Sequence, residues 1–192
     1  SNLLPIKPSL KALRITEEVL NNPEKIFTSC KIPQSAIACL KFTALFNFQA
    51  SYLIKQIVPS KKEDRFVEKL IEANIRLKKI ETLLDKVNFL KNYENILYPA
   101  LICGISHDPF GIARSWFYRE IEQFYKKVYL KNKKKLPIIK GDDILALGFE
   151  PSPVVGEILE RIETLVLAGK ISKKEEALEE IKNRYLLKIS SP

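Results

Sequence analysis

The sequence predicts an all-α protein in which a helical bundle or array is followed by a small helical tail. Over most of the 192 residues, apolar side chains recur three and four positions apart, which is the spacing of one face of an α-helix. No stretch longer than four residues alternates between polar and apolar side chains, so no strand is expected. Only 6 glycines occur, and the connections between helical stretches are short, as in bundles. We assign residues 1–135 to the helical body and residues 136–192 to the tail.

The first three expected helices are bounded by capping or helix-breaking residues. After an extended lead-in, Ser9 is placed to cap a helix that stops near Pro23. Pro33 suits the first turn of a helix that runs to about residue 58, where a proline breaks it. Ser60 then caps the longest helix, over residues 61–90. The apolar face of that helix consists of Phe66, Leu70, Ala73, Leu77, Ile80, Leu84 and Val87.

Two further helices complete the expected body. One covers residues 93–105, with an interruption at Pro99 because proline removes a backbone donor. A turn over residues 107–111 leads into the other, which covers about residues 112–131. Its large aromatic residues are expected to fill the core: Trp116, Phe117 and Phe124.

The tail opens with two short helices that meet at a turn rich in glycine and proline, and we call residues 141–159 the corner. Asp142 or Asp143 is placed to cap the first helix, and Gly148 to close it in a left-handed conformation. Pro153 occupies the first turn of the second helix, where a missing N–H is tolerated. A last helix is expected to begin with a capping box made of two residues: Ser172 and Glu175.

The charge of the chain favours a polyanionic partner. The formal net charge is +9 and the sequence pI is about 9.4, as in many nucleic-acid-binding domains. A genome biased toward lysine codons is the alternative explanation of this charge. No apolar run approaches the ~18–20 residues that span a membrane. The chain has three cysteines, namely Cys30, Cys39 and Cys103, and none of them has Cys-x-x-Cys spacing. We expect them to be reduced core residues of a cytoplasmic protein.

No residue set in the sequence is assigned to catalysis or to metal binding. His107-Asp108 is the dipeptide of HD-type phosphohydrolases, but those sites need further histidines and this chain has one. Asp108 is therefore expected to cap the turn before Pro109. Asp142 and Asp143 diverge by about 100° on a helix, so their carboxylates do not converge on a pair of metal ions.

A basic cluster over residues 119–140 is the strongest candidate for binding nucleic acid. Eight cations fall in this range, and Glu120 and Glu122 are its only carboxylates. Lysines neutralise phosphates without reading base sequence, which suits recognition of an A-form stem by its shape. A solvated loop is the alternative interpretation. The predicted RNA-binding residues of the cluster are Arg119, Lys126, Lys127, Lys131, Lys133, Lys134, Lys135 and Lys140.

Glycines and prolines of the tail fall at fixed offsets. The pattern is Gly-Asp-Asp-Ile-Leu, then Gly-Phe-Glu-Pro-Ser-Pro-Val-Val-Gly-Glu-Ile-Leu-Glu, then Leu-Ala-Gly-Lys-Ile-Ser-Lys-Lys-Glu-Glu-Ala-Leu. Over about residues 136–182 it resembles the C-terminal tail of bacterial-type tRNA nucleotidyltransferases, which comprise the CCA-adding enzymes and related poly(A) polymerases. The matching positions are Gly141, Asp143, Gly148, Pro151, Pro153, Gly156 and Gly169-Lys170. The chain departs from the family pattern in two places: its Gly-x-Asp-Leu element has either an additional Asp142 or a shifted Asp143, and Ser152 replaces a glycine.

The resemblance implies template-independent addition of CCA, or part of it, to tRNA 3′ ends with ATP, CTP and Mg²⁺. It further implies that the body and tail hold the acceptor stem and the T-loop end of tRNA. The family's catalytic head, a small sheet with paired aspartates that bind two metal ions, has no counterpart in these residues. We therefore expect the head upstream, and we expect neither catalysis nor a cofactor in this chain alone. The oligomeric state is left open.

The corner is also similar to a helix–hairpin–helix, in which the start of the second helix binds phosphate through backbone N–H groups. For this reason Gly141, Gly148, Ser152 and Gly156 are added to the predicted RNA-binding residues. A purely structural turn between two helices is the alternative. Two other functions stay open for the chain: the same region of a poly(A) polymerase, and a non-enzymatic module that binds nucleic acid or protein.

Overall fold

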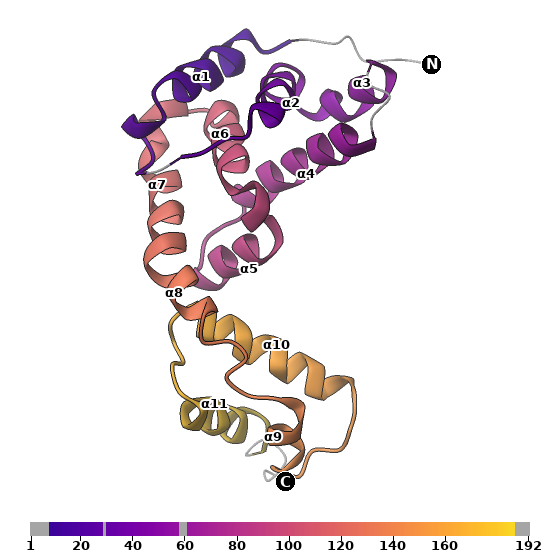
Figure 1. Cartoon of the computed structure of the whole chain (residues 1–192), viewed down its shortest axis with the longest axis vertical. Helices are drawn as coiled ribbons and strands as arrows, with labels where there is room; N and C mark the ends of the chain where they lie inside the picture. Colours follow the sequence, from indigo (N-terminus) through magenta and orange to yellow (C-terminus); the bar gives the residue numbers. More distant parts are fainter. Residues whose placement is uncertain (1–7, 29, 58–60, 187–192) are drawn as a thin grey trace. The chain divides into compact units, whose positions relative to one another are not determined.

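The computed structural model describes residues 8–28, 30–57 and 61–186, and every regular element in these ranges is a helix (Figure 1). The prediction of an all-α fold is therefore confirmed. The cap expected at Ser60 lies outside the described residues. The internal contacts of the chain divide it into two compact units. Unit 1 comprises residues 1–81 and 89–122, and unit 2 comprises residues 82–88 and 123–192. The boundary near residue 135 that we derived from the sequence stays a prediction.

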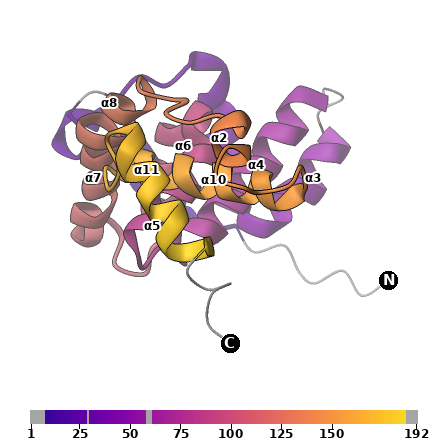
Figure 2. The same ribbon diagram turned by 90° about the horizontal axis from the view of Figure 1, so that it is seen from below.

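Unit 1 is built around α6 (Leu97–His107), a helix that is apolar on nearly every side. Nine of its 11 residues are buried. A helix without a polar face needs neighbours on several sides, and α1 (Leu10–Asn21), α2 (Gln34–Phe46) and α4 (Lys61–Leu77) all contact it. Helices α2, α4 and α6 lie side by side in both views (Figure 1 and Figure 2).

Hydrogen bonds between buried polar groups add to this packing. Thr16 on α1 and Ser106 on α6 share a hydrogen bond of 2.7 Å between their hydroxyl oxygens. The buried carboxylate of Glu122 accepts the Thr28 N–H at 3.0 Å and the Tyr98 hydroxyl at 3.2 Å. A buried carboxylate is tolerated when donors satisfy it, so these bonds hold the segment after α1 against the helix that carries Glu122.

The first helix is as predicted. The Ser9 hydroxyl oxygen accepts a hydrogen bond from the Ala12 N–H at 3.3 Å, and α1 ends at Asn21. A short 3-10 turn, η1 (Pro23–Lys25), follows with its proline in the first position. The N-terminal cap and the proline stop therefore both act where the sequence placed them.

The single helix expected from Pro33 to residue 58 is wrong, because the chain breaks near the middle. Helix α2 gives way to a 3-10 turn, η2 (Asn47–Gln49), before α3 (Ala50–Ile57) begins. Asn47 has a φ of 49°, a left-handed conformation that asparagine adopts more readily than most residues. Apolar spacing continues across the break because both sides pack into one cluster, which includes Cys39, Ala50, Ile54 and Val67.

The continuous helix expected over residues 61–90 is also wrong. Helix α4 ends at Leu77, and α5 (Leu83–Tyr93) begins after a reciprocal cap. The Thr82 hydroxyl accepts the Asp85 N–H at 3.2 Å, and the Asp85 carboxylate accepts the Thr82 N–H at 2.8 Å. This Thr-x-x-Asp arrangement marks the start of a helix. The sequence predicted one continuous helix because the apolar spacing continues through this start.

Pro99 does not interrupt a helix, contrary to the prediction. A 3-10 turn, η3 (Glu94–Ile96), leads directly into α6, so Pro99 lies in the first turn of that helix. The first N–H groups of a helix have no partner within it, and a proline there removes no hydrogen bond.

The helix expected over about 112–131 has three parts. It follows a 3-10 turn, η4 (Gly111–Arg114), and consists of α7 (Ser115–Phe124), a π-helical turn η5 (Tyr125–Tyr129) and α8 (Leu130–Lys133). The expected burial of Trp116 is wrong, because its side chain is 62% exposed. The inward face of α7 is formed instead by Tyr118, Ile121 and Glu122.

Unit 2 has its own hydrophobic core. Its helices include α9 (Gly141–Leu145), α10 (Pro153–Leu167) and α11 (Lys174–Ile181), followed by a π-helical turn, η6 (Lys182–Leu186). The core residues come from these helices and the segments beside them: Ile139, Ile144, Ile158, Ile162, Leu165, Val166, Ile171, Ala177 and Ile181.

Gly169 ends α10 and fits tightly against α8 and the turn before it. Its N–H donates to Val166 and the Lys170 N–H donates to Leu165, which is the paired bonding of a Schellman motif. Gly169 has a φ of +75°, and a β-carbon there would lie 3.2 Å from both Asn132 and Val128. The glycine of the Gly-Lys element is therefore required by the fold itself.

Candidate RNA-binding surfaces in unit 2

Residues 123–140 form the first candidate surface, and we call them the lysine segment. They contain seven lysines and no carboxylate. Tyr129 and Asn132 are buried on the inner face, whereas Lys127, Lys131 and the run 133–135 are exposed. Helical periodicity explains part of this separation, because the buried positions are three residues apart on one face and Lys127, Lys131 and Lys133 lie off that face.

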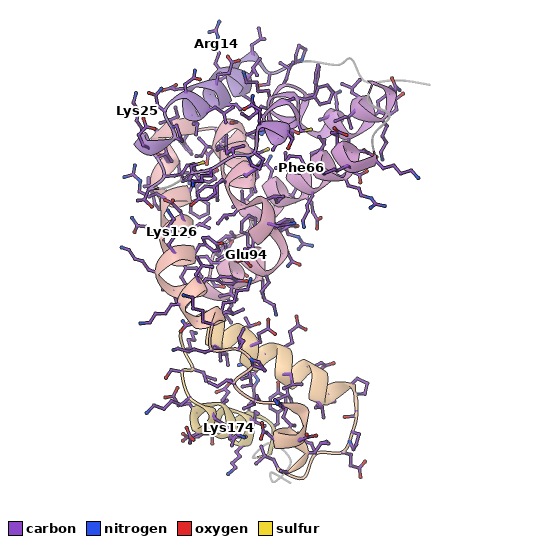
Figure 3. All side chains as sticks on the ribbon, viewed as in Figure 1. Arg14, Lys25, Phe66, Glu94, Lys126 and Lys174 are labelled. Carbon is purple, nitrogen blue, oxygen red and sulfur yellow. The ribbon has the colours of Figure 1, made fainter. Side chains whose placement is uncertain are left out.

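Most of the exposed lysines in this segment have no anionic partner. Within the described ranges, no carboxylate pairs with the ammonium groups of Lys127, Lys131, Lys134 and Lys135. Exposed lysines elsewhere do pair, as Lys55 does with Glu68 at 2.7 Å. Unpaired, solvated ammonium groups keep their full charge available to an approaching phosphate. Lys126 lies in the π-helical turn η5 and is labelled in Figure 3.

Aromatic rings lie beside the lysines of this stretch. The rings of Tyr125 and Tyr129 lie 5.8 Å apart, and the Lys133 ammonium lies 5.9 Å from the centre of the Tyr129 ring. A cation at this distance from an aromatic face is attracted by about 0.5–1 kcal/mol at an exposed site. Lys126 and Lys127 extend from the π-helical turn η5, Lys131 and Lys133 extend from α8, and the other three lysines follow that helix.

Arg119, the remaining cation of the predicted cluster, belongs to unit 1 and has structural partners. Its Nε donates to the carbonyl of Ile26 at 2.9 Å, and its Nη2 donates to the carbonyl of Lys25 at 2.8 Å. These bonds satisfy carbonyl groups at the end of η1, where a cation also complements the local dipole. Arg119 keeps its charge, but two of its five donors are engaged.

The corner, residues 141–159, is the second candidate surface, and its backbone agrees with two predictions. Gly148 has a φ of +96° and follows α9 with its N–H donating to Leu145 at 2.9 Å, so the left-handed closing residue is confirmed. Pro153 is the first residue of α10, also as predicted. Ser152 has a φ of −160°, which is extended backbone that any residue adopts. A serine in place of the family's glycine therefore causes no strain.

Asp143, one of the two residues predicted to cap α9, does take part in its cap, although from within the helix. Lys140 is the residue before the helix, and the Asp143 carboxylate accepts its N–H at 2.8 Å from within the first turn. Asp143 also binds the ammonium of Lys174, which is labelled on α11 in Figure 3. The hydrogen bond from Lys174, followed by that from the Lys140 N–H, lowers the pKa of Asp143. Asp142 is exposed.

The capping box expected at the last helix involves a different glutamate. Helix α11 begins at Lys174, and the Ser172 N–H donates to the carboxylate of Glu176 at 2.7 Å, with the hydroxyl also in contact. Glu175, the predicted partner, is exposed. The helix starts one residue later than a Ser-x-x-Glu box requires, which moves the partner from the third residue to the fourth.

The two other glycines of the corner have no structural reason to be glycine. A β-carbon added at Gly141 or at Gly156 would meet nothing within 4 Å among the placed atoms, and neither residue has a left-handed φ. Gly156 lies inside α10 and is exposed, where glycine costs about 1 kcal/mol relative to alanine. A bare backbone at this position is therefore open to a partner outside the chain.

The residues considered for chemistry take structural roles. The Asp108 carboxylate accepts the Phe110 N–H at 2.9 Å, which confirms the predicted cap of this turn. Burial lowers the pKa of His107, whose Nδ1 donates to the carbonyl of Cys103 at 2.9 Å. Burial raises the pKa of the Cys103 thiol to about 12. Across residues 8–28, 30–57 and 61–186, no group of three or more histidine, cysteine or acidic side chains is arranged to hold a metal ion.

Within the described residues, none of the three cysteines forms a disulfide bond. Cys39 and Cys103 are buried, as predicted for core residues, and Cys30 is half-buried. Within the described part of the chain, no helix is both long and apolar enough to cross a bilayer.

A comparison with known families decides the identity of the region. The family described as "tRNA nucleotidyltransferase domain 2 putative" matches residues 31–181, which include most of unit 1 and nearly all of unit 2. The chain belongs to this family. No curated protein and no solved structure gives a significant match. The resemblance inferred from the corner motif is therefore confirmed, and the parent protein belongs to a nucleotidyltransferase family related to tRNA.

The structure distributes the predicted RNA-binding residues of this tRNA nucleotidyltransferase domain over both units. Arg119 lies in unit 1, and the other eleven lie in unit 2 along the lysine segment and the corner. These surfaces were predicted together because they are adjacent in the chain. Which lysines pair with carboxylates was not predictable from the sequence, because ion pairs such as that between Asp143 and Lys174 depend on the tertiary fold.

Proposed function

We propose that this domain binds tRNA and positions its 3′ end for a nucleotidyltransferase head elsewhere in the parent protein. That head would add CCA, or part of it, with ATP, CTP and Mg²⁺ in the cytoplasm. The observation that supports tRNA binding best is the lysine segment, with seven lysines, no carboxylate and at least four ammonium groups left unpaired in the described structure. Because the chain belongs to a tRNA nucleotidyltransferase domain family, we take tRNA to be the polyanion that this surface binds.

The chemistry of the surface favours recognition of shape over recognition of sequence. Lysine ammonium groups are point charges without the planar fork by which arginine reads a base edge. The deep major groove of an A-form helix also hides its base edges from side chains. A segment rich in exposed lysines therefore suits the phosphate backbone of an RNA stem, which is common to all tRNAs.

Binding of labelled tRNA lacking CCA to the chain, measured by fluorescence anisotropy, tests the proposal. We expect saturable binding that weakens steeply with salt, with a weaker response to a DNA duplex of equal length. The same preparation, supplied with ATP, CTP and Mg²⁺, should incorporate no nucleotide into tRNA. Tighter binding to the DNA duplex would contradict the tRNA assignment, and incorporation by the chain alone would contradict a separate head.

Competition separates the proposed function from the related poly(A) polymerase function. Unlabelled tRNA should displace labelled tRNA at lower concentrations than single-stranded poly(A) does, because the surface is proposed to follow a stem. Preferential displacement by poly(A) or by unstructured RNA would favour a poly(A) polymerase region instead.

A further inference from the structure

A polar cavity in unit 1 lies outside both candidate surfaces. It has a volume of about 280 Å³ and is formed where the end of α4, the turn after α6 and the start of α7 meet. Its lining residues are Leu77, Lys78, Ile80, His107, Asp108, Pro109, Arg114, Phe117 and Tyr118. This size lies near the lower limit for pockets that take small organic ligands, so the cavity fits one planar ring better than an extended chain.

The cavity is lined by two cationic side chains, Lys78 and Arg114, and by one carboxylate, that of Asp108. The Arg114 guanidinium lies 3.7 Å from the Asp108 carboxylate and 5.2 Å from the centre of the Phe117 ring. Lys78 is exposed, and no carboxylate among the residues with assigned positions pairs with its ammonium group. Burial lowers the pKa of His107, which favours its neutral imidazole over the charged form. The lining therefore carries one net positive charge, which matches the single negative charge of a phosphodiester.

One of the two aromatic rings that line the cavity is held by a hydrogen bond, and the other packs against it. The Tyr118 hydroxyl donates to the buried Asp108 carboxylate at 3.0 Å, which also accepts the Phe110 N–H. Phe117 contacts Tyr118 edge to face, with ring centres 5.2 Å apart. Rings fixed in this way lose little entropy when a base packs against them, and stacking on an aromatic side chain tolerates every base.

We propose that this cavity binds one unpaired nucleotide of the RNA, with its base against Phe117 and its phosphodiester at Lys78 and Arg114. An A-form stem does not fit a cavity of this size, so the ligand is a nucleotide outside the stem. This inference rests on the proposed function, because it takes the bound polymer to be RNA. It adds a contact in unit 1 that reads single-stranded RNA, in addition to the lysines of unit 2.

The test compares two RNA probes on the 192-residue chain. One is a blunt RNA duplex, and the other is the same duplex with a short unpaired 3′ extension. We expect the extended duplex to bind about tenfold more tightly, since stacking of a single base contributes on that scale. Phe117→Leu, Lys78→Gln and Arg114→Gln should each reduce this difference while leaving the affinity for the blunt duplex unchanged.

Two neighbouring substitutions serve as controls for those variants. Lys79→Gln removes another exposed lysine one residue away, and Trp116→Leu removes an exposed aromatic residue. Neither side chain lines the cavity. Both should keep the tenfold preference. Circular dichroism and the midpoint of thermal unfolding identify a variant that has lost its fold.

The outcomes separate this inference from the proposed function. Equal binding of both probes by the unmodified chain would overturn the cavity assignment alone, whereas binding of neither probe would overturn the proposed function as well. A preference for the extension that survives all three cavity substitutions would also overturn the assignment. If free ATP or CTP abolished the preference at concentrations below those of competing single-stranded RNA, the site would belong to a free nucleotide instead.

Discussion

The lysine segment and the corner are adjacent in the chain and opposite in charge. Residues 123–140 carry seven lysines and no carboxylate, whereas residues 141–159 carry four carboxylates and no lysine or arginine. Both were predicted to bind RNA, the first from its charge and the second from its glycines and prolines. A helix N-terminus attracts phosphate through about half a unit charge, and nearby carboxylates oppose that attraction. The difference assigns most of the binding free energy to the lysine segment.

The corner can still contribute through its shape. Gly148 is required by the turn, whereas nothing among the placed atoms requires glycine at Gly141 or Gly156. These two positions leave the backbone accessible, so a partner could approach it closely without a strong charge attraction. The corner is accordingly expected to adjust the fit of the RNA, and the lysine segment to supply the affinity.

The largest expected effect is on the lysine segment. Reversing Lys131, Lys133 and Lys134 to glutamate should weaken tRNA binding by about 100-fold near physiological salt, because three phosphate contacts become repulsive. Anisotropy titration measures the dissociation constant. The matched control reverses three exposed lysines of unit 1, namely Lys11, Lys31 and Lys79, and changes the net charge equally. If the control weakened binding as much, net charge would explain the affinity and the segment would have no special role.

The next largest effect is on stability, where alanine substitutions at Gly148 and Gly156 should change the free energy of unfolding in opposite directions. Gly148→Ala should lower the free energy of unfolding by about 1–2 kcal/mol, because a side chain is strained at a φ of +96°. Gly156→Ala should raise it by about 0.5–1 kcal/mol, because alanine favours the helix. Urea denaturation measures both values. If Gly156→Ala weakens tRNA binding while it stabilises the fold, the RNA approaches the backbone there, and unchanged affinity excludes that approach.

A third test concerns the cap of α9 and its dependence on pH. The pKa of Asp143 is lowered in the folded state, so its carboxylate stabilises the fold above the ordinary aspartate value of 3.8. That contribution is lost as the pH falls through the lower, folded-state pKa. The unmodified chain should therefore be more stable than Asp143→Asn near pH 7, and the difference should disappear in acid. Asp142→Asn removes an equal charge from the exposed neighbour and serves as the control for the change in net charge.

The smallest expected effect is at Ser152. Because its φ of −160° is open to any residue, Ser152→Gly should change tRNA affinity by less than about twofold and should not stabilise the turn. Anisotropy with the same tRNA provides the comparison. A gain of tenfold or more would show that the family's glycine provides a contact that the serine blocks.

Local backbone chemistry explains which elements were predictable. Gly148, Pro153 and Ser9 were assigned correctly because each depends on its own conformation or on a bond to a near neighbour. The breaks at Asn47 and Thr82 were missed because apolar spacing continues across them, and packing against other helices, rather than periodicity, determines where the chain turns.

Tertiary contacts explain the remaining differences. The exposure of Trp116 depends on which face of α7 meets the rest of unit 1, and residues 118, 121 and 122 form that face. The structural partners of Arg119 lie 93 and 94 positions away in the chain, at a distance that no local pattern indicates. The cavity at Lys78 and Arg114 likewise joins separate helices, so the sequence did not reveal it.

The salt dependence of tRNA binding tests the central claim most directly. Each phosphate contact contributes about 0.7–0.9 to the slope of log affinity against log salt concentration. We predict that reversal of Lys131, Lys133 and Lys134 reduces the magnitude of this slope by about 2–3, and that Gly156→Ala leaves it unchanged. An unchanged slope in the triple lysine variant would contradict the account, because the lysine segment would then not contact the RNA backbone.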